Sequence, residues 1–175
     1  MATLPAPEPL TLRDGTRLSV RPIHPDDAPR LQALHARLST ETIFLRFMGM
    51  RAVLLPDEAR DFATLDYQTR MAFVATQPEG ADECIVGVAR YAVVSQRRPG
   101  EAEAAIVIED RFQNRGLGTL LLERLLAYAR SHGITAFVAE INAENERMLK
   151  FVRHSGLPTE KRLEGGVWEI RVKII

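Results

Sequence analysis

Gln113-Asn114-Arg115-Gly116-Leu117-Gly118 is the stretch that decides the fold and most of the chemistry. It lies between an apolar run at residues 104–108 and a leucine-rich run at residues 120–128. A strand that turns through a glycine pair into a helix gathers backbone N–H groups that have no acceptor inside the helix. Together with the positive end of the helix dipole, these groups form an anion site suited to phosphate. The sequence therefore predicts a phosphate-bearing ligand.

Length and composition indicate one globular domain over residues 1–175, with a loose tail at residues 1–9, which contain three prolines. Hydrophobic residues make up 46% and charged residues 26%, as in ordinary globular domains. Lys+Arg and Asp+Glu both number 23, so the formal net charge is zero. No overall field favours nucleic acid or a membrane surface, and neither is expected as a partner.

Cys84 is the only cysteine, which excludes an intramolecular disulfide and a cysteine-based zinc site. The histidines show no metal-ligand spacing, so no metal is expected. The N-terminus has no basic segment followed by an apolar run, as a signal peptide would, and no window is long and apolar enough to cross a bilayer. We therefore expect a cytoplasmic protein.

Hydrophobic periodicity and turn residues predict the order of the elements. An Asp14-Gly15 hairpin joins two short strands, and three helices follow. Residues 39–42 are expected to cap a short second helix that carries Ile43, Phe44 and Phe47. The other expected helices are 25–38, 56–65, 117–132 and 143–154; the expected strands are 10–12, 16–21, 71–76, 84–95, 101–109, 135–141, 157–163 and 167–174; the main expected turns are 77–82 and 97–100. This order indicates a mixed α/β sheet with helices on its faces.

Two common phosphate loops do not fit the glycine stretch. A P-loop needs Lys before Ser or Thr, whereas Gly118 is followed directly by Thr119. A dinucleotide fingerprint needs a third glycine, and that position is Leu121.

Gln113, Gly116 and Gly118 instead match the pattern Gln/Arg-x-x-Gly-x-Gly/Ala, and here the chain resembles the GNAT superfamily of acetyl-CoA-dependent N-acetyltransferases. Residues 139–157, with Asn145 and Gly156, resemble the fifth strand and following helix of that family. Segments of the N-terminal half, such as Leu12-Arg13-Asp14-Gly15 and Val20-Arg21-Pro22-Ile23, resemble the Pat-type protein lysine acetyltransferases. The resemblance implies a mixed, mostly antiparallel central sheet with helices on both faces, and acetyl-CoA as cofactor.

The resemblance also assigns residues to the cofactor. Backbone groups on the strand before the loop would pair with the pantetheine arm, the loop amides would hold the pyrophosphate, and Arg115 would add a charged contact. Glycines let the backbone approach closely. The cofactor-binding residues implied are Ile106, Val107, Ile108, Gln113, Asn114, Arg115, Gly116, Leu117, Gly118, Thr119 and Asn145.

A general base is needed because an amine with a pKa of about 10.4 is almost entirely protonated at neutral pH. Glu103 stands where Pat-type enzymes carry this carboxylate, with Glu101 as the alternative and Glu109 as a third acid nearby. All three share one face if the strand is regular, and a bulge would split them. Alanines at 102, 104 and 105 predict an apolar site that raises the pKa of Glu103.

Many GNAT enzymes place a tyrosine, as general acid, at the position that is Val152 here. Tyr67, Tyr91 and Tyr128 are possible substitutes. The leading interpretation is a monomeric or homodimeric acetyltransferase acting on an exposed lysine of a protein, with acyl-CoA synthetase-like targets implied by the resemblance. Two alternatives remain open: an N-acetyltransferase of a small amine, and a non-catalytic acyl-CoA sensor.

Overall fold

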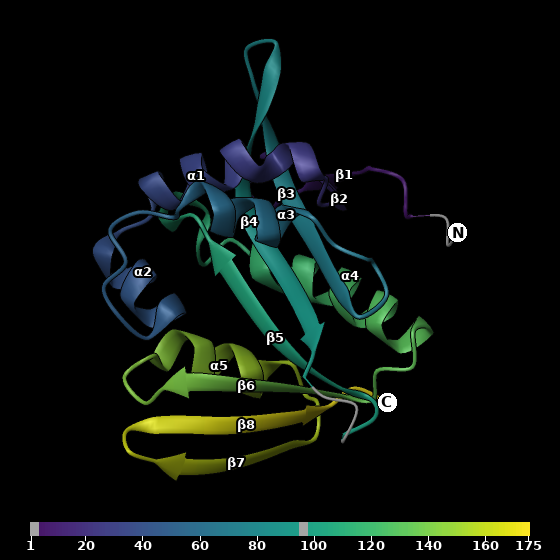
Figure 1. Cartoon of the computed structure of the whole chain (residues 1–175), viewed down its shortest axis with the longest axis vertical. Helices are drawn as coiled ribbons and strands as arrows, with labels where there is room; N and C mark the ends of the chain where they lie inside the picture. The colour runs from purple at the N-terminus through teal and green to yellow at the C-terminus, as the bar shows by residue number, and fades with distance from the viewer. Residues whose placement is uncertain (1–3, 95–97) are drawn as a thin grey trace.

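A computed structural model describes residues 4–94 and 98–175 and shows one mixed sheet with helices on both faces, as predicted (Figure 1). The strands are β1 (Glu8–Thr11), β2 (Arg17–Pro22), β3 (Arg70–Glu79), β4 (Asp82–Val93), β5 (Glu101–Ile108), β6 (Ala136–Asn142), β7 (Thr159–Glu164) and β8 (Val167–Lys173). The helices are α1 (Ala28–Arg37), α2 (Thr40–Phe47), α3 (Pro56–Ala63), α4 (Leu117–Ser131) and α5 (Glu146–His154), with 3₁₀ turns η1 (Pro25–Asp27) and η2 (Asp110–Phe112).

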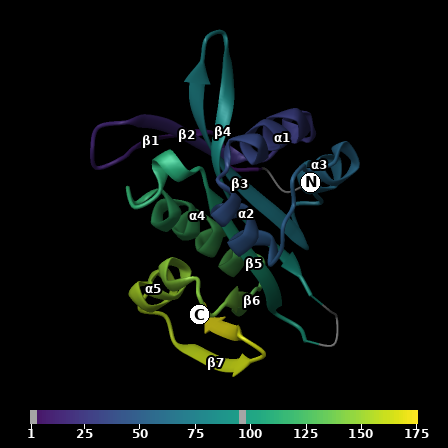
Figure 2. The ribbon, with the colours of Figure 1, turned by 90° about the vertical axis from the view of Figure 1, so that its left-hand side faces the viewer.

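The strand order is β1-β2-β3-β4-β5-β6-β8-β7. Only β5 and β6 pair in parallel; the other neighbouring strands of this sheet are antiparallel. Figure 2 shows α1 and α3 on one side of the sheet and α4 and α5 on the other. We call these the α1 face and the α4 face.

Apolar residues on both faces of the central strands build two cores. Alternate residues of β3 and β4 pack under α1 and α3, around Leu34 and Val74, while the others pack under α4, around Leu121 and Leu125. This burial on both sides explains why β3 and β4 read as continuous apolar runs in the sequence.

Several boundaries differ from those expected. Glu8 and Pro9 belong to β1, where Glu8 pairs with Val20, so the tail expected through residue 9 ends earlier. The turn expected over 77–82 is shorter, because the β3–β4 ladder continues to Glu79↔Asp82 and forms a projecting hairpin (Figure 1). The expected strand end at Ser95 and turn start at Arg97 lie outside the described residues.

Candidate active site

The sheet opens between β5 and β6. Their pairing runs only from Glu101↔Ala136 to Glu103↔Val138, although β5 continues to Ile108 and β6 to Asn142. Beyond Glu103 the two strands diverge, and Figure 1 shows them separating. The inner edge of β5 is therefore not covered by β6 beyond Glu103.

The alternation of an antiparallel ladder decides which backbone groups face this opening. The Val94 amide donates to the Glu101 carbonyl at 3.4 Å and the Glu109 amide donates to the Val86 carbonyl at 2.9 Å, so odd-numbered residues of β5 bond toward β4. Ile106 and Ile108 consequently turn their backbone groups toward the opening, whereas those of Val107 face β4. Only two of the three predicted strand residues can thus offer backbone groups there.

The glycine stretch leads from η2 into the start of α4, as the sequence predicted. Gly116 is the N-cap residue with φ of +87°, a conformation that favours glycine. The first intrahelical bond joins the Leu120 amide to the Gly116 carbonyl at 3.2 Å, so the amides of residues 117–119 precede the helical ladder. Gly118 has space for a Cβ, whose nearest neighbour would be Phe151 Cε2 at 3.6 Å. The backbone conformation at position 116 therefore requires glycine. At position 118 a Cβ would fit within the protein, so packing does not explain the glycine there.

Gln113 braces the loop. Its Nε2 donates to the Ile108 carbonyl at 2.9 Å and to Thr42 Oγ1 at 3.2 Å, and its Oε1 accepts from Arg147. Gln113 thereby joins β5, α2 and α5 through one side chain.

Asp110 fixes the start of α2 next to this brace. Its carboxylate accepts from the Ser39 amide at 2.9 Å and from Thr42 Oγ1 at 2.8 Å. Burial disfavours the charge, but the hydrogen bonds from Ser39 and Thr42 outweigh it and hold the pKa of Asp110 below its usual range. The loop and α2 are therefore held to one another.

Arg115 does not line the opening and has its partners elsewhere, so its charged contact with the cofactor stays a prediction. Its guanidinium donates to Asp14 and Thr16 in the β1–β2 hairpin and stacks over Phe112, with Cζ 5.1 Å from the ring centroid. The Leu117 side chain is buried in the core, so only its backbone can serve a ligand. The sequence could not place Arg115, because its partners are about a hundred positions away.

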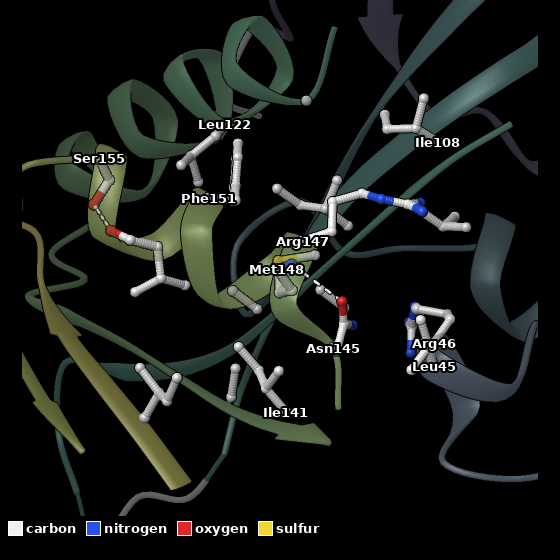
Figure 3. Close-up of a pocket in the computed structure, with 18 of the residues that line it drawn as sticks. Leu45, Arg46, Ile108, Leu122, Ile141, Asn145, Arg147, Met148, Phe151 and Ser155 are labelled. Atoms are coloured by element: carbon white, nitrogen blue, oxygen red, sulfur yellow. Dashed lines mark hydrogen bonds between the residues drawn. The ribbon is translucent and has the colours of Figure 1, made fainter. Parts of the chain in front are cut away.

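A cavity of about 660 Å³ fills the divergence between β5 and β6. Figure 3 shows it bounded by α4 and α5 on one side and by α2 on the other. Of the predicted residues, those that line it are Glu103, Ile106, Val107, Ile108, Gln113, Asn114, Gly116, Gly118, Thr119 and Asn145.

Asn145 is the N-cap of α5, and its Oδ1 accepts from the Met148 amide at 3.1 Å (Figure 3). Arg147 follows it and reaches Gln113, and Lys150 also lines the cavity. Arg147 and Lys150 were missed by the sequence analysis, although their positions two and five residues after the cap could have indicated a cation near the loop.

Among the three acids considered for general base, only Glu103 lines the cavity. The β4–β5 register is continuous through β5, so no bulge separates Glu101 from Glu103, and both lie on the α1 face. Glu101 accepts from Arg171 Nε at 2.7 Å, and buried Glu109 accepts from Arg37 Nε at 3.1 Å. Within residues 4–94 and 98–175, no hydrogen bond or ion pair occupies the Glu103 carboxylate.

Glu103 is exposed and its neighbours are cationic, which corrects the expected apolar site. Ala102 and Ala104 project to the α4 face because the pleat alternates. Arg46 and Arg90 lie on the side of Glu103, close enough for its charge to act on both. Burial lowers the pKa of Arg46, and the Glu103 carboxylate opposes that shift. No sequence pattern indicated either arginine.

The three tyrosines lie outside the cavity lining. Tyr67 donates to the Ile23 carbonyl at 2.9 Å, Tyr91 to that of Gln68 at 3.3 Å, and Tyr128 to that of Tyr67 at 2.7 Å. Burial raises the pKa of each phenol. None of them replaces the usual tyrosine, and Val152 does line the cavity.

The described residues contain no group of three or more His, Cys, Asp or Glu side chains arranged to hold a metal ion. Among the helices described, none is long and apolar enough to span a membrane.

Comparison with known proteins agrees with this architecture. Residues 17–158 match the family model described as the acetyltransferase (GNAT) domain. An acetyltransferase of Pseudomonas aeruginosa is 33% identical over 138 residues, covering 79% of this chain and 73% of the relative. The acetyltransferase Pat of Mycolicibacterium smegmatis is 29% identical over 89% of this chain, which spans only 46% of that relative's length.

Among solved structures, the GNAT domain of S. lividans PAT superposes with a TM-score of 0.87 at 30% identity, covering 98% of this chain and 99% of that domain. The fold and the family match point to the same family. The structure has the parallel pair β5–β6 and the glycine turn into α4, and the family model matches most of the chain. The chain belongs to the GNAT acetyltransferase family.

Proposed function

We propose that this acetyltransferase moves an acetyl group from acetyl-CoA to the side-chain amine of a protein lysine. The observation that carries the proposal is the Glu103 carboxylate, which has no partner among the described residues and lies in the same cavity as the start of α4. A proton acceptor and an anion site are thereby brought together at the opening of the sheet.

The residues present fit acetyl-CoA, which GNAT acetyltransferases use in general. The backbone groups of Ile106 and the amide of Ile108 face the opening as those of an unpaired strand edge, which suits the amides of a pantetheine arm, whereas the Ile108 carbonyl already accepts from Gln113. Backbone amides of residues 114–119 suit the pyrophosphate, whereas that of Gln113 donates to the Asp110 carbonyl at 3.2 Å. Asn145 lines the same cavity and adds a polar group beside the arm. The bound cofactor supplies an activated acetyl thioester.

Glu103 would take the proton that the acceptor amine must lose. At pH 7.4 about one lysine amine in a thousand is neutral, which costs roughly 4 kcal/mol without a base. A positioned carboxylate lowers this cost by accepting the proton as the amine attacks. Because no tyrosine lines the cavity formed by the described residues, the proposal assigns no general acid.

The lysine acceptor follows from the resemblance to the Pat-type enzymes, and the similarity to the acetyltransferase Pat and to the GNAT domain of S. lividans PAT agrees with that resemblance. The acceptor itself is a proposal, since the chain spans less than half of the mycobacterial relative.

The test compares Glu103→Gln with Glu140→Gln, which removes a second carboxylate that lines the same cavity. We expect Glu103→Gln to lower kcat/KM by about 10²–10⁴-fold between pH 6 and 9. The Kd of acetyl-CoA, measured by calorimetry, should stay within about threefold of wild type in both variants. Wild-type turnover by Glu103→Gln would show that Glu103 is not the base.

The acceptor is tested by mass spectrometry of a cell lysate incubated with the protein and labelled acetyl-CoA. Label on a lysine of a few proteins supports the proposal. Label confined to small molecules contradicts the protein acceptor and favours a small amine, and absence of any transfer favours an acyl-CoA sensor.

A further inference from the structure

Two arginines beside Glu103 have no anionic partner among the described residues. Four arginines gather at this end of the α1 face: Arg46, Arg51, Arg70 and Arg90. Arg51 pairs with Glu58 at 2.9 Å and Arg70 with Asp61 at 2.9 Å. Within residues 4–94 and 98–175, neither Arg46 nor Arg90 forms an ion pair or donates a hydrogen bond to another residue. Their contacts instead are aromatic.

Both guanidinium groups are held in place by rings. Arg46 Cζ lies 5.0 Å from the Phe47 ring centroid, and Arg90 Cζ lies 4.4 Å from that of Phe62. Both side chains are half-buried, and both line a small cavity of about 50 Å³ between the sheet and α1–α3. Stacking on a ring orients a guanidinium but leaves its N–H donors free for another partner.

Arg46 also faces the large cavity. Figure 3 shows its guanidinium directed from α2 toward Asn145, across the opening of the sheet. Glu103 lies on the same face, and the charges of Arg46 and Glu103 both act on Arg90. Asp61, which pairs with Arg70, also acts on Arg90, but neither carboxylate forms an ion pair with Arg46 or Arg90 within the described residues. A half-buried charge is costly unless it is paired.

The side of the sheet indicates which substrate would supply the missing anion. The glycine loop and α4 belong to the α4 face, whereas Arg46, Arg90 and Glu103 belong to the α1 face. An amine that approaches Glu103 along the α2 side of the cavity passes Arg46.

We propose that Arg46, backed by Arg90, binds a carboxylate carried by the acceptor close to the amine that is acetylated. This rests on the proposed function and narrows its substrate class. The carboxylate has two possible sources: an acidic side chain that flanks the acceptor lysine in a peptide, or an α-carboxylate of the acceptor itself. A planar guanidinium with two free N–H donors matches either carboxylate.

Two matched substrate pairs distinguish these sources. The first pair is a lysine peptide with Asp next to the lysine and the same peptide with Asn there. The second is Nα-acetyl-lysine and its carboxamide. Steady-state kcat and KM are measured for wild type, Arg46→Gln and Arg46→Lys. The control is Arg60→Gln, which removes an exposed arginine paired with Asp57 on α3.

We expect wild type and Arg60→Gln to favour the carboxylate member of one pair by about tenfold in kcat/KM, mainly through KM. Arg46→Gln should abolish that preference while acetylating the neutral member within about threefold of wild type. Arg46→Lys should restore part of the preference, because lysine keeps the positive charge but lacks the planar pair of N–H donors. Melting curves confirm that each variant is folded.

Equal rates for both members of both pairs in wild type would overturn the inference, as would an equal loss on all substrates in Arg46→Gln. It is also overturned if Arg46 matters only when succinyl-CoA replaces acetyl-CoA, because the guanidinium then serves the donor. Acetylation of none of the four substrates would count against the proposed function itself, and the inference would fall with it.

Discussion

The two ends of the sheet differ in how they are packed. In the N-terminal part, β3 and β4 are covered on both faces, and Met71 and Ile85 are fully buried. In the C-terminal part, α5 has no fully buried residue, and every residue of β7 is exposed. The site lies where these parts meet, so the stability of the fold and the contacts to ligands reside largely in different residues.

The largest effect is expected in the two-sided core. Leu121→Ala removes a fully buried side chain of α4 and should lower the free energy of unfolding by about 3–5 kcal/mol. Leu163→Ala on β7, where the side chain is half exposed, should change it by less than about 0.5 kcal/mol. Urea denaturation measures both, and equal losses would refute the division.

Asp27 is the next most sensitive position. Its buried carboxylate accepts from Arg21 at 2.7 Å and from Arg30 at 2.9 Å. Asp27→Asn leaves both guanidinium groups underpaired and should cost about 3 kcal/mol in urea denaturation. Asp26→Asn, at an exposed position, serves as the control and should cost little.

The same carboxylate makes stability depend on pH. Burial favours the neutral form, but the hydrogen bonds and charge of Arg21 outweigh it and hold the pKa of Asp27 below the usual 3.8. A depressed pKa gives stability that is present above pH 3.8 and is lost as the pH falls through the folded-state value. Asp27→Asn should therefore reduce the fall in the free energy of unfolding at acidic pH. If that fall is unchanged, other groups cause it.

Substitutions at Gly116 and Gly118 should affect different properties: the first lowers the stability of the fold, and the second lowers the affinity for acetyl-CoA. Gly116→Ala forces a Cβ into a positive φ and should cost about 1 kcal/mol. Gly118→Ala meets only ordinary contacts and should leave stability within about 1 kcal/mol, yet weaken acetyl-CoA binding about tenfold or more. Thermal melts and calorimetry give the two readouts, and unchanged affinity in Gly118→Ala would place the pyrophosphate elsewhere.

The smallest effect is expected at Arg115, which is tied to the β1–β2 hairpin. Arg115→Gln removes a partly exposed ion pair with Asp14 and should cost at most about 1 kcal/mol. The Kd of acetyl-CoA should stay within about twofold. A tenfold rise would show that the side chain leaves Asp14 to reach the cofactor.

The sequence predicted the elements that local patterns define. The Asp14-Gly15 hairpin, the glycine turn into α4 and the shared face of Glu101 and Glu103 all follow from short-range rules, and the structure confirms them. The extension of β3 through Pro78 was not predicted, because proline and glycine in this segment indicated a turn. A residue without an N–H is tolerated there because β2 no longer pairs with β3.

Contacts distant in sequence could not be predicted. Arg115 donates to Asp14, and Arg171 donates to Glu101, only because the fold brings these strands and loops together. The cations near Glu103 come from α2 and β4, and nothing in the spacing of Arg46 or Arg90 marks them. The residues on the cofactor side of the site can thus be predicted from one segment of sequence, whereas those on the acceptor side come from several distant segments.

The divergence of β5 and β6 also bears on how the protein avoids aggregation. A bare strand edge normally invites a strand from another molecule. Here the bare edge lies inside the sheet, with β6, β8 and β7 continuing on its far side. The unpaired part of the β5 edge is flanked by strands of the same sheet, so it does not lie at the outer edge, where a strand of another molecule could be added.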